Sequence, residues 1–218
     1  MKSNSQLQSD VQTELEWQPS VSAAQIGVAA KDGVVTLTGQ VAHFTEKTAA
    51  EDTAKGVYGV KAVANDITVE LPGSSRQTDA DIAAAALSAL KWDVQVPDDK
   101  VKVVVRDGWV TLEGTVEWQY QKDAAQRCVR YLMGVAGVAN SIGIKARATA
   151  AGVKGKIEEA FRRHADLDAR RIGVETAGGT VTLTGSVSSW SERDDARSAA
   201  WAAPGVTRVD DDRLVIVP

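Results

Sequence analysis

Apolar residues recur along this chain at two spacings, and each spacing predicts one kind of element. Trios spaced by four residues are Leu7, Val11 and Leu15, then Ile82, Ala86 and Leu90, then Val153, Ile157 and Phe161. A spacing of four places each trio on one face of a helix. Pairs spaced by two follow the trios, at Ile26 and Val28, Val101 and Val103, and Ile172 and Val174. These pairs predict strands with one buried face.

A ten-residue phrase is present three times, as KDGVVTLTGQ from Lys31, RDGWVTLEGT from Arg106 and AGGTVTLTGS from Ala177. Its turn glycines, Gly33, Gly108 and Gly179, lie 75 and 71 residues apart. Asp-Gly and Gly-Gly pairs supply the positive φ angles of a tight hairpin turn. One module of about this length is therefore repeated three times.

Each phrase continues into a second strand whose apolar residues share one face. They are Val35, Leu37 and Val41, then Val110, Leu112 and Val116, then Val181, Leu183 and Val187. A glycine lies inside each of these strands, at Gly39, Gly114 and Gly185. It marks either a bulge or a close approach of two backbones.

A second helix is expected at roughly 45 to 57, 119 to 133 and 191 to 203, with Ser191 and Asp194 spaced as a capping box. A third strand follows Gly59, Gly134 and Gly205, and its last copy contains a one-residue insertion before Leu214. The predicted modules cover residues 1–71, 77–146 and 150–218. Each has the order α-β-β-α-β.

This order predicts an α+β fold with a mixed three-stranded sheet, because the crossover through the second helix makes strand three parallel to strand two. Each helix has one apolar stripe, so both helices are expected on the same face of the sheet. The other face is predicted to be open to water. By alternation it carries Thr36 and Thr38, Thr111 and Glu113, and Thr182 and Thr184.

These residues together resemble the BON domain family. The V-T-L-x-G-x-V strand is followed by GVKAVANDI from Gly59 and by GVAGVANSI from Gly134, whereas the third copy, GVTRVDDDRL from Gly205, replaces the Asn and the Ile. The resemblance covers nearly the whole chain, with three modules where the OsmY type has two. It implies a bacterial, non-enzymatic protein that binds phospholipid or membrane surfaces and is associated with osmotic or envelope stress.

Composition narrows the partners. The net charge is −4 and the pI is about 5.3, so the chain as a whole attracts neither nucleic acid nor an anionic bilayer. The first module region, residues 1–71, has five basic and nine acidic residues, while residues 148–218 have ten and eleven. The sequence contains no apolar run long enough for a transmembrane segment, and its beginning does not resemble a signal peptide. A cytoplasmic protein is expected, or a periplasmic one if a leader has been removed.

Catalysis has little support. The two histidines, His43 and His164, fall in different modules, and no nucleophile recurs beside either one. The acidic runs that begin at Asp98, Asp194 and Asp210 lack calcium-loop spacing. Cys128, the one cysteine, lies in a helix pattern, and a small buried side chain is favoured over a reactive thiol. We therefore predict no catalytic residues, no metal site and no cofactor.

Three pairs of aromatic or polar positions have to be assigned either to the fold or to a contact surface. Trp17 and Trp92 align at the end of helix one; they either anchor at a lipid headgroup layer or, as favoured, seal the edge of a core. Trp109 and Val104 are predicted on the open sheet face, where they contact another module, a second chain or lipid. Asn65 and its counterpart Asn140 are interpreted as structural, satisfying nearby backbone groups.

The candidate contact for lipid headgroups is a basic cluster around the first helix of the third module. It comprises Lys154, Lys156, Arg162, Arg163, Arg170 and Arg171. Glu158, Glu159, Asp166 and Asp168 interrupt it, so a solvated face with ion pairs between residues four apart is the alternative.

Three functional hypotheses remain open at this point. The first is a stress-associated module protein that touches phospholipid surfaces. The second is a protein-interaction scaffold that uses the open sheet faces, with self-association included. The third is a cytoplasmic sensor of a small ligand or cation.

Overall fold

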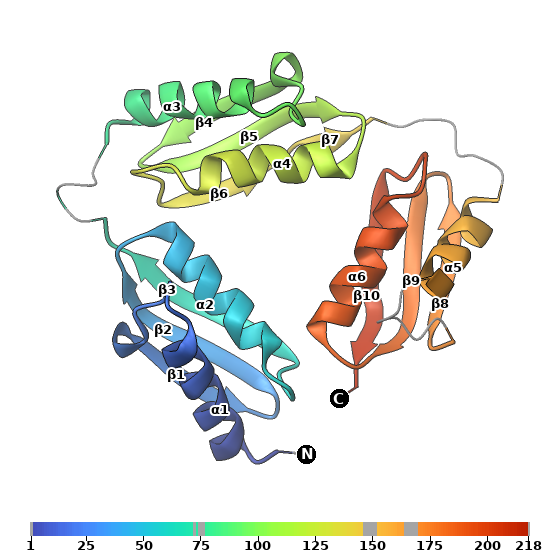
Figure 1. The fold of residues 1–218 in the computed structure, drawn as a ribbon, viewed down its shortest axis with the longest axis horizontal. Helices are drawn as coiled ribbons and strands as arrows, with labels where there is room; N and C mark the ends of the chain where they lie inside the picture. The colour runs from blue at the N-terminus through green and yellow to red at the C-terminus, as the bar shows by residue number, and fades with distance from the viewer. Residues whose placement is uncertain (1, 72, 74–76, 146–151, 164–169, 218) are drawn as a thin grey trace. The chain divides into compact units, whose positions relative to one another are not determined.

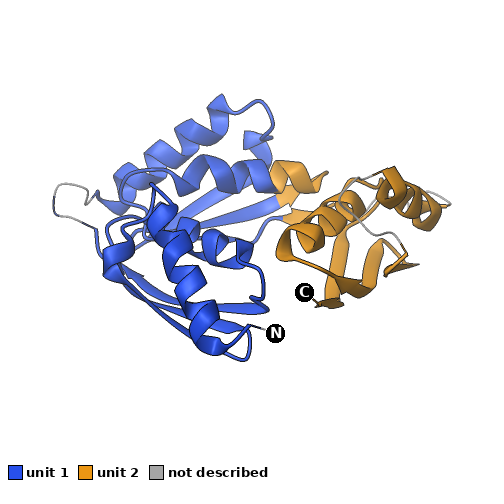
Figure 2. Cartoon of the chain, turned by 60° about the horizontal axis from the view of Figure 1, so that its bottom comes forward, with its two compact units in different colours: residues 1–114, 123–142 blue, residues 115–122, 143–218 orange. Residues whose placement is uncertain are grey.

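The computed structural model describes residues 2–71, 73, 77–145, 152–163 and 170–217, and it contains the predicted module three times (Figure 1). The chain divides into two compact units, Met1–Gly114 with Asp123–Ile142, and Thr115–Lys122 with Gly143–Pro218 (Figure 2). The boundary crosses the middle module, which contributes residues to both units.

The first module consists of α1 (Asn4–Trp17), β1 (Ile26–Lys31), β2 (Val34–Val41), α2 (Phe44–Gly56) and β3 (Ala62–Val69). β2 pairs antiparallel with β1 and parallel with β3, so it is the central strand. Both helices cover one face of the sheet, and the other face is open, as predicted (Figure 1). The trio on α1, Leu7, Val11 and Leu15, is buried against Val35 and Leu37 of β2 in one core.

The third module repeats this arrangement with α5 (Val153–Arg163), β8 (Ile172–Ala177), β9 (Thr180–Val187), α6 (Trp190–Trp201) and β10 (Arg208–Ile216). β9 is the central strand, antiparallel to β8 and parallel to β10. The register of β10 shifts between Asp210 and Arg213, where three residues span two of the partner strand. The one-residue insertion predicted from the sequence is therefore confirmed as a bulge.

The middle module contains α3 (Asp79–Trp92), β4 (Val101–Arg106), β5 (Trp109–Val116) and α4 (Gln119–Arg130). Its third strand is interrupted, and β6 (Gly137–Asn140) and β7 (Gly143–Ile144) both pair parallel with β5. Helix α4 ends at Arg130 rather than at the predicted residue 133. The predicted α+β fold with three tandem α-β-β-α-β modules is confirmed.

The hairpin turns have the positive φ angles that their residues predict. In the first turn, Asp32 has φ 53° and Gly33 has φ 88°; in the third, Gly178 and Gly179 have φ 55° and 92°. Gly39 of β2 lies opposite Ile26, the first residue of β1, and a Cβ added to Gly39 would overlap the carbonyl oxygen of Gln25. The β1–β2 ladder ends at the pair Ile26–Gly39, and the β2–β3 ladder continues through Gly39 without a register shift. Of the two predicted explanations, the close backbone approach is the one observed at Gly39.

The capping box predicted at Ser191 and Asp194 is wrong by two residues. Helix α6 begins at Trp190, and the Ser189 side chain accepts a 3.1 Å hydrogen bond from the Glu192 amide. Glu192 in turn accepts from the amide and the hydroxyl group of Ser188, both at 2.6 Å. These hydrogen bonds satisfy the Glu192 carboxylate, so the side chain can be buried.

Candidate functional site

The first helix of each module ends in a large side chain that is exposed to solvent. Trp17 ends α1 and is 83% exposed, and Trp92 ends α3 and is 84% exposed. Arg163 ends α5 at the corresponding position of the third module and is also exposed. The favoured prediction that Trp17 and Trp92 seal a core is therefore wrong.

Helix geometry explains this exposure. The last buried residue of α1 is Leu15, and that of α3 is Leu90. A residue two positions further along a helix is turned by about 200°, so Trp17 and Trp92 cannot share the buried face. A tryptophan that does pack on a core is Trp190 at the start of α6, which is half-buried against the core of the third module.

The basic side chains of α5 lie on two flanks rather than on one patch. Helical spacing places Lys154, Glu158 and Arg162 on one flank of the buried trio, and the remaining Lys156, Glu159 and Arg163 on the other. Each flank thus has two cations with one glutamate between them.

Two weak ion pairs are present along these flanks. The Lys154 ammonium lies 3.9 Å from Glu158, and the Arg163 guanidinium lies 4.0 Å from Glu159. The predicted alternative, a solvated face with ion pairs between residues four apart, is therefore partly realised. Exposed pairs of this kind contribute about 0.3–0.5 kcal/mol each, so they leave the cations available to an anion.

The remaining two members of the basic cluster lie in the turn directly before β8. Arg170 and Arg171 are both exposed, and the Nε of Arg171 donates a 3.1 Å hydrogen bond to the Ser186 hydroxyl group. Asp166 and Asp168, which the sequence placed within the cluster, lie outside the described residues, as does His164. The described part of the cluster therefore consists of α5 and this turn.

Trp109 and Val104 lie on the open face of the β4–β5 sheet, where alternation places them. Trp109 is 54% exposed. Its ring lies against Gly137 on the neighbouring strand β6, because a Cβ added to Gly137 would come within 2.6–2.7 Å of three ring carbons. The indole thus covers a glycine that has no side chain of its own. The use of this face for a partner stays a prediction.

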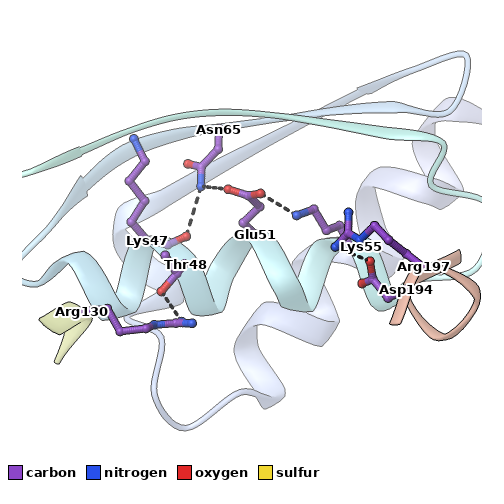
Figure 3. Close-up of polar contacts among 8 residues, drawn as sticks. All are labelled: Lys47, Thr48, Glu51, Lys55, Asn65, Arg130, Asp194 and Arg197. Atoms are coloured by element: carbon purple, nitrogen blue, oxygen red, sulfur yellow. Dashed lines mark hydrogen bonds and ion pairs between the residues drawn. The ribbon is translucent and has the colours of Figure 1, made fainter. Parts of the chain in front are cut away.

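A polar network ties the third strand of the first module to its second helix (Figure 3). Asn65 donates from Nδ2 to the Lys47 carbonyl oxygen at 3.1 Å and to the Glu51 carboxylate at 3.0 Å, and its Oδ1 accepts from the Ile67 amide at 3.3 Å. The Lys55 ammonium binds the other oxygen of Glu51 at 2.6 Å. The prediction that Asn65 has a structural role is confirmed, because its side chain hydrogen-bonds to the backbone of Lys47 and of Ile67.

The same position is tied to the second helix in the other modules. Asn140 donates to Gln126 at 3.2 Å and accepts from the Ile142 amide at 3.3 Å. In the third module, Arg193 binds Asp211 through Nε at 2.7 Å. Sequence reasoning missed the helix partners, although alignment of the repeats places Lys47, Lys122 and Arg193 at one position.

Burial of Glu51 opposes its ionisation. Hydrogen bonds from Lys55 and Asn65 and the charges of Lys55 and Lys47 outweigh burial, so the pKa of Glu51 lies below its ordinary value.

The environment of Cys128 raises the pKa of its thiol. Its Sγ lies 3.2 Å from an Asp93 carboxylate oxygen. Burial, the hydrogen bond to Asp93 and the Asp93 charge raise the pKa of Cys128 to about 11. Such a thiol stays protonated at neutral pH.

Within the part of the chain that the structure describes, no group of three or more His, Cys, Asp or Glu side chains could hold a metal ion. None of the helices in the same residues is long and apolar enough to cross a bilayer. His43, the histidine that is described, precedes α2 at the N-cap position without a side-chain capping bond.

Three tandem modules with this topology and this repeated glycine pattern define a class of small α+β domains. The BON domain profile matches the chain three times, at residues 3–70, 78–146 and 149–218. The chain therefore belongs to the BON domain family.

Two curated proteins are similar to parts of the chain. Osmotically-inducible protein Y of Escherichia coli (strain K12) is 34% identical over 130 residues, which are 58% of this chain and 65% of that protein. The 21 kDa hemolysin of Actinobacillus pleuropneumoniae is 34% identical over 114 residues, 51% of this chain and 58% of that protein. The chain thus spans less than two thirds of the length of either relative.

Among solved structures, the C-terminal domain of CdsD, the structural protein of the type III secretion system of Chlamydia trachomatis, is 12% identical to this chain. The alignment covers 96% of both chains, with a TM-score of 0.27. A score this low does not show a shared arrangement of the whole chains.

Proposed function

We propose that this chain is a non-enzymatic, stress-associated BON protein that acts by contact with phospholipid surfaces. Family membership supports the class, and the name of osmotically-inducible protein Y supports an association with osmotic stress. The hemolysin name of the second relative supports an activity at membranes.

The observation that carries this proposal is the exposed side chain at the end of each first helix. Trp17 and Trp92 keep most of their surface exposed, although a tryptophan side chain is on average largely buried in a folded protein. Tryptophan concentrates at the headgroup layer of bilayers, where its apolar ring and its N–H group are both satisfied. Arg163, at the same position in the third module, suits an anionic phosphate.

The charge of each module decides which headgroups it is expected to contact. The first module has a net charge of −4, so its Trp17 is expected to contact neutral headgroups rather than anionic ones. The third module carries the cations Lys156, Arg162 and Arg163 on an exposed helix. Each Lys or Arg near an anionic membrane contributes about 1 kcal/mol of attraction at moderate salt.

Sedimentation with vesicles tests the proposal. The full chain is mixed with phosphatidylcholine vesicles and with vesicles that also contain phosphatidylserine, at low and at physiological salt. We expect binding to both, stronger with phosphatidylserine. The double variant Arg162→Glu and Arg163→Glu should lower the partition to phosphatidylserine vesicles at least tenfold. The double variant Trp17→Ser and Trp92→Ser should weaken binding to both kinds of vesicle.

The matched control is Lys102→Glu with Arg106→Glu, the same charge change on two exposed side chains of β4. It should reduce the partition less than the α5 pair. If the wild-type chain fails to sediment with either vesicle at both salt concentrations, the proposal is wrong. Equal losses from the two charge pairs would show general electrostatics instead of a contact at α5.

A further inference from the structure

The solvent face of α3 differs from the corresponding faces of α1 and α5. On α1 the outward positions carry Ser9, Asp10, Gln12 and Thr13, and on α5 the described ones carry Gly155, Lys156, Glu158 and Glu159. The same positions of α3 carry Ala84, Ala85, Leu87 and Ser88. All three helices cover the same kind of sheet, so the fold does not require this apolar surface.

The α3 face is exposed in the structure. Leu87 is 55% exposed, and Ala84, Ala85 and Ser88 are exposed beside it. Just beyond the helix, Val94 is completely exposed. Between Asp81 and Lys91 the helix has no charged residue. An apolar surface of this kind on a soluble helix indicates an interaction site.

The charges at the two ends of this face suggest what covers it. Asp81 lies in the first turn of α3 and Lys91 in its last turn, and both are exposed. They are ten residues apart, or about 15 Å along the axis. Two copies of α3 that pack antiparallel about a two-fold axis level with Ala86 bring Asp81 of each copy opposite Lys91 of the other. The two Asp81–Lys91 ion pairs are equivalent, because each copy contributes the same surface, as a two-fold interface requires.

Side-chain volumes fit the same register. In this register Ala84 of one copy lies opposite Ser88 of the second copy along the middle of the contact. Ala85 and Leu87 are turned by about 200° from each other and lie on opposite flanks of the helix, so Leu87 lies beside Leu87 of the second copy. Small residues in the middle of the contact allow the two helix axes to approach to the short end of the usual 8–10 Å range. We propose that this chain self-associates through antiparallel pairing of α3, with Leu87 as the central apolar contact.

The proposed dimer is weak. Helix α3 has 14 residues and is therefore about 21 Å long. One helix pair of this length buries less than the roughly 1,200 Å² of a standard stable interface. We expect a dissociation constant on the order of 10–100 μM, which corresponds to about 5.5–7 kcal/mol of binding free energy.

A bilayer is a poorer occupant of this face. Apolar helix faces that lie on membranes are bordered mainly by Lys and Arg. Asp81 and Asp93 border the α3 face at its two ends, and Lys91 is the one cation of the helix. Carboxylates would be pressed against lipid phosphates, whereas a second copy supplies the opposite charge. Trp92 lies at the rim of the proposed pair.

Sedimentation equilibrium of the full chain without lipid, at protein concentrations from about 1 to 300 μM, tests the proposal. We expect the wild type to show a concentration-dependent monomer–dimer equilibrium, and Leu87→Glu to weaken it at least tenfold. Glu158 occupies this position in α5, so α3 is expected to tolerate the glutamate. Gln12→Glu places the same charge on α1 and is the matched control that should leave association unchanged.

Cross-linking tests the register. In a Cys128→Ser background, Ala84→Cys and Ser88→Cys chains should form disulfides when mixed and should cross-link poorly when each is alone, because the two positions face each other only between copies. A wild-type chain that stays monomeric at 300 μM overturns the proposal, as does equal association of Leu87→Glu and wild type. Loss of vesicle binding by Leu87→Glu with no monomer–dimer equilibrium would assign the face to lipid.

Discussion

The Lys47 ammonium group donates a 2.7 Å hydrogen bond to the carbonyl oxygen of Ile67. The amides of Ala62 and Glu70 donate to Gly33 and Val41 on the β2 side, so even-numbered residues of β3 face β2 and Ile67 faces the free edge of the sheet. The Ile67 amide donates to Asn65 Oδ1. Side chains therefore occupy both backbone groups that Ile67 would offer to another strand.

The third module satisfies its edge strand with different residues. Arg193 donates to the carbonyl oxygen of Asp211 at 3.0 Å, and the Asp212 amide donates to Asp210 Oδ1 at 3.2 Å. Free edge strands are templates for unwanted pairing between chains. Repetition of this arrangement indicates that the helix-two cation and the strand-three Asn or Asp act together to block the edge.

The first prediction concerns Asn65. Asn65→Ala removes the bonds to Glu51, to the Lys47 carbonyl and to the Ile67 amide, and should lower the local stability of β3 by about 1–2 kcal/mol. Hydrogen exchange of peptides from residues 62–70, followed by mass spectrometry, measures this loss. Asp66→Ala, at the exposed neighbouring position, should change exchange by less than about 0.5 kcal/mol. Equal effects of the two variants would contradict the clamp.

The second prediction concerns pH. Since the pKa of Glu51 is lowered in the folded state, the contribution of Glu51 to stability is full above its ordinary value near 4.5 and is lost as pH falls through the lower folded value. Glu51→Gln should therefore make the exchange of residues 44–70 less sensitive to pH below about 4.5, after correction for intrinsic rates. Gln126, the natural counterpart in α4, indicates that the fold accepts the amide. An unchanged pH profile would contradict this role of Glu51.

The repeat made most of the fold predictable. Leu7, Val11 and Leu15 are buried because their spacing matches the helix period, and the Asp32-Gly33 turn needs only local backbone geometry. The prediction for Trp17 is wrong because the hydrophobicity of a residue does not account for its angle on the helix. The Lys47–Ile67 contact could not be predicted, since it depends on how a long side chain crosses from α2 to a strand edge.

The candidate surfaces were harder to find for a related reason. Periodicity identifies what is buried, whereas a contact surface is a departure from the expected polar exterior. Leu87 lies outside the Ile82, Ala86 and Leu90 trio, and within an alanine-rich helix it does not stand out in the sequence. Its exposure is informative by comparison with α1 and α5, which have polar residues at the corresponding position.

The third prediction concerns the strand glycine. Gly39 has φ 132°, and a Cβ there would overlap the Gln25 carbonyl oxygen. Gly39→Ala should destabilise the first module by on the order of 2–4 kcal/mol. Gly56→Ala, at the end of α2 with nothing within 4 Å of an added Cβ, should be neutral or stabilising by up to about 1 kcal/mol. Urea unfolding monitored by circular dichroism compares the two, and a similar midpoint for both would contradict the steric argument.

The fourth prediction concerns Cys128. With a pKa of about 11, its thiolate fraction at pH 8 is on the order of 100-fold below that of an ordinary cysteine. Alkylation by iodoacetamide should be slow in the folded protein and rapid in urea. Asp93→Asn removes the charge that helps to keep the thiol protonated, and should speed alkylation without unfolding the chain. If Asp93→Asn alkylates no faster than wild type, burial alone protects the thiol.

The fifth prediction concerns the pairing of Trp109 with Gly137. The corresponding cross-strand pair is Val34 with Ala62 in the first module and Thr180 with Arg208 in the third. A large ring therefore occurs together with the residue that leaves room for it. Gly137→Ala places a Cβ about 2.6 Å from the indole and should cost about 1–2 kcal/mol unless the ring moves off the sheet.

Replacing both residues by the pair of the first module tests this coupling. Trp109→Val alone uncovers the Gly137 backbone and should cost about 1 kcal/mol. Trp109→Val with Gly137→Ala should cost less than the sum of the two single changes by at least about 1 kcal/mol, because the valine leaves space for the new methyl group. Urea unfolding of the four proteins in the cycle measures the coupling. Additive costs would show that Trp109 does not depend on Gly137, and the exposed ring would then need a partner outside this sheet to explain it.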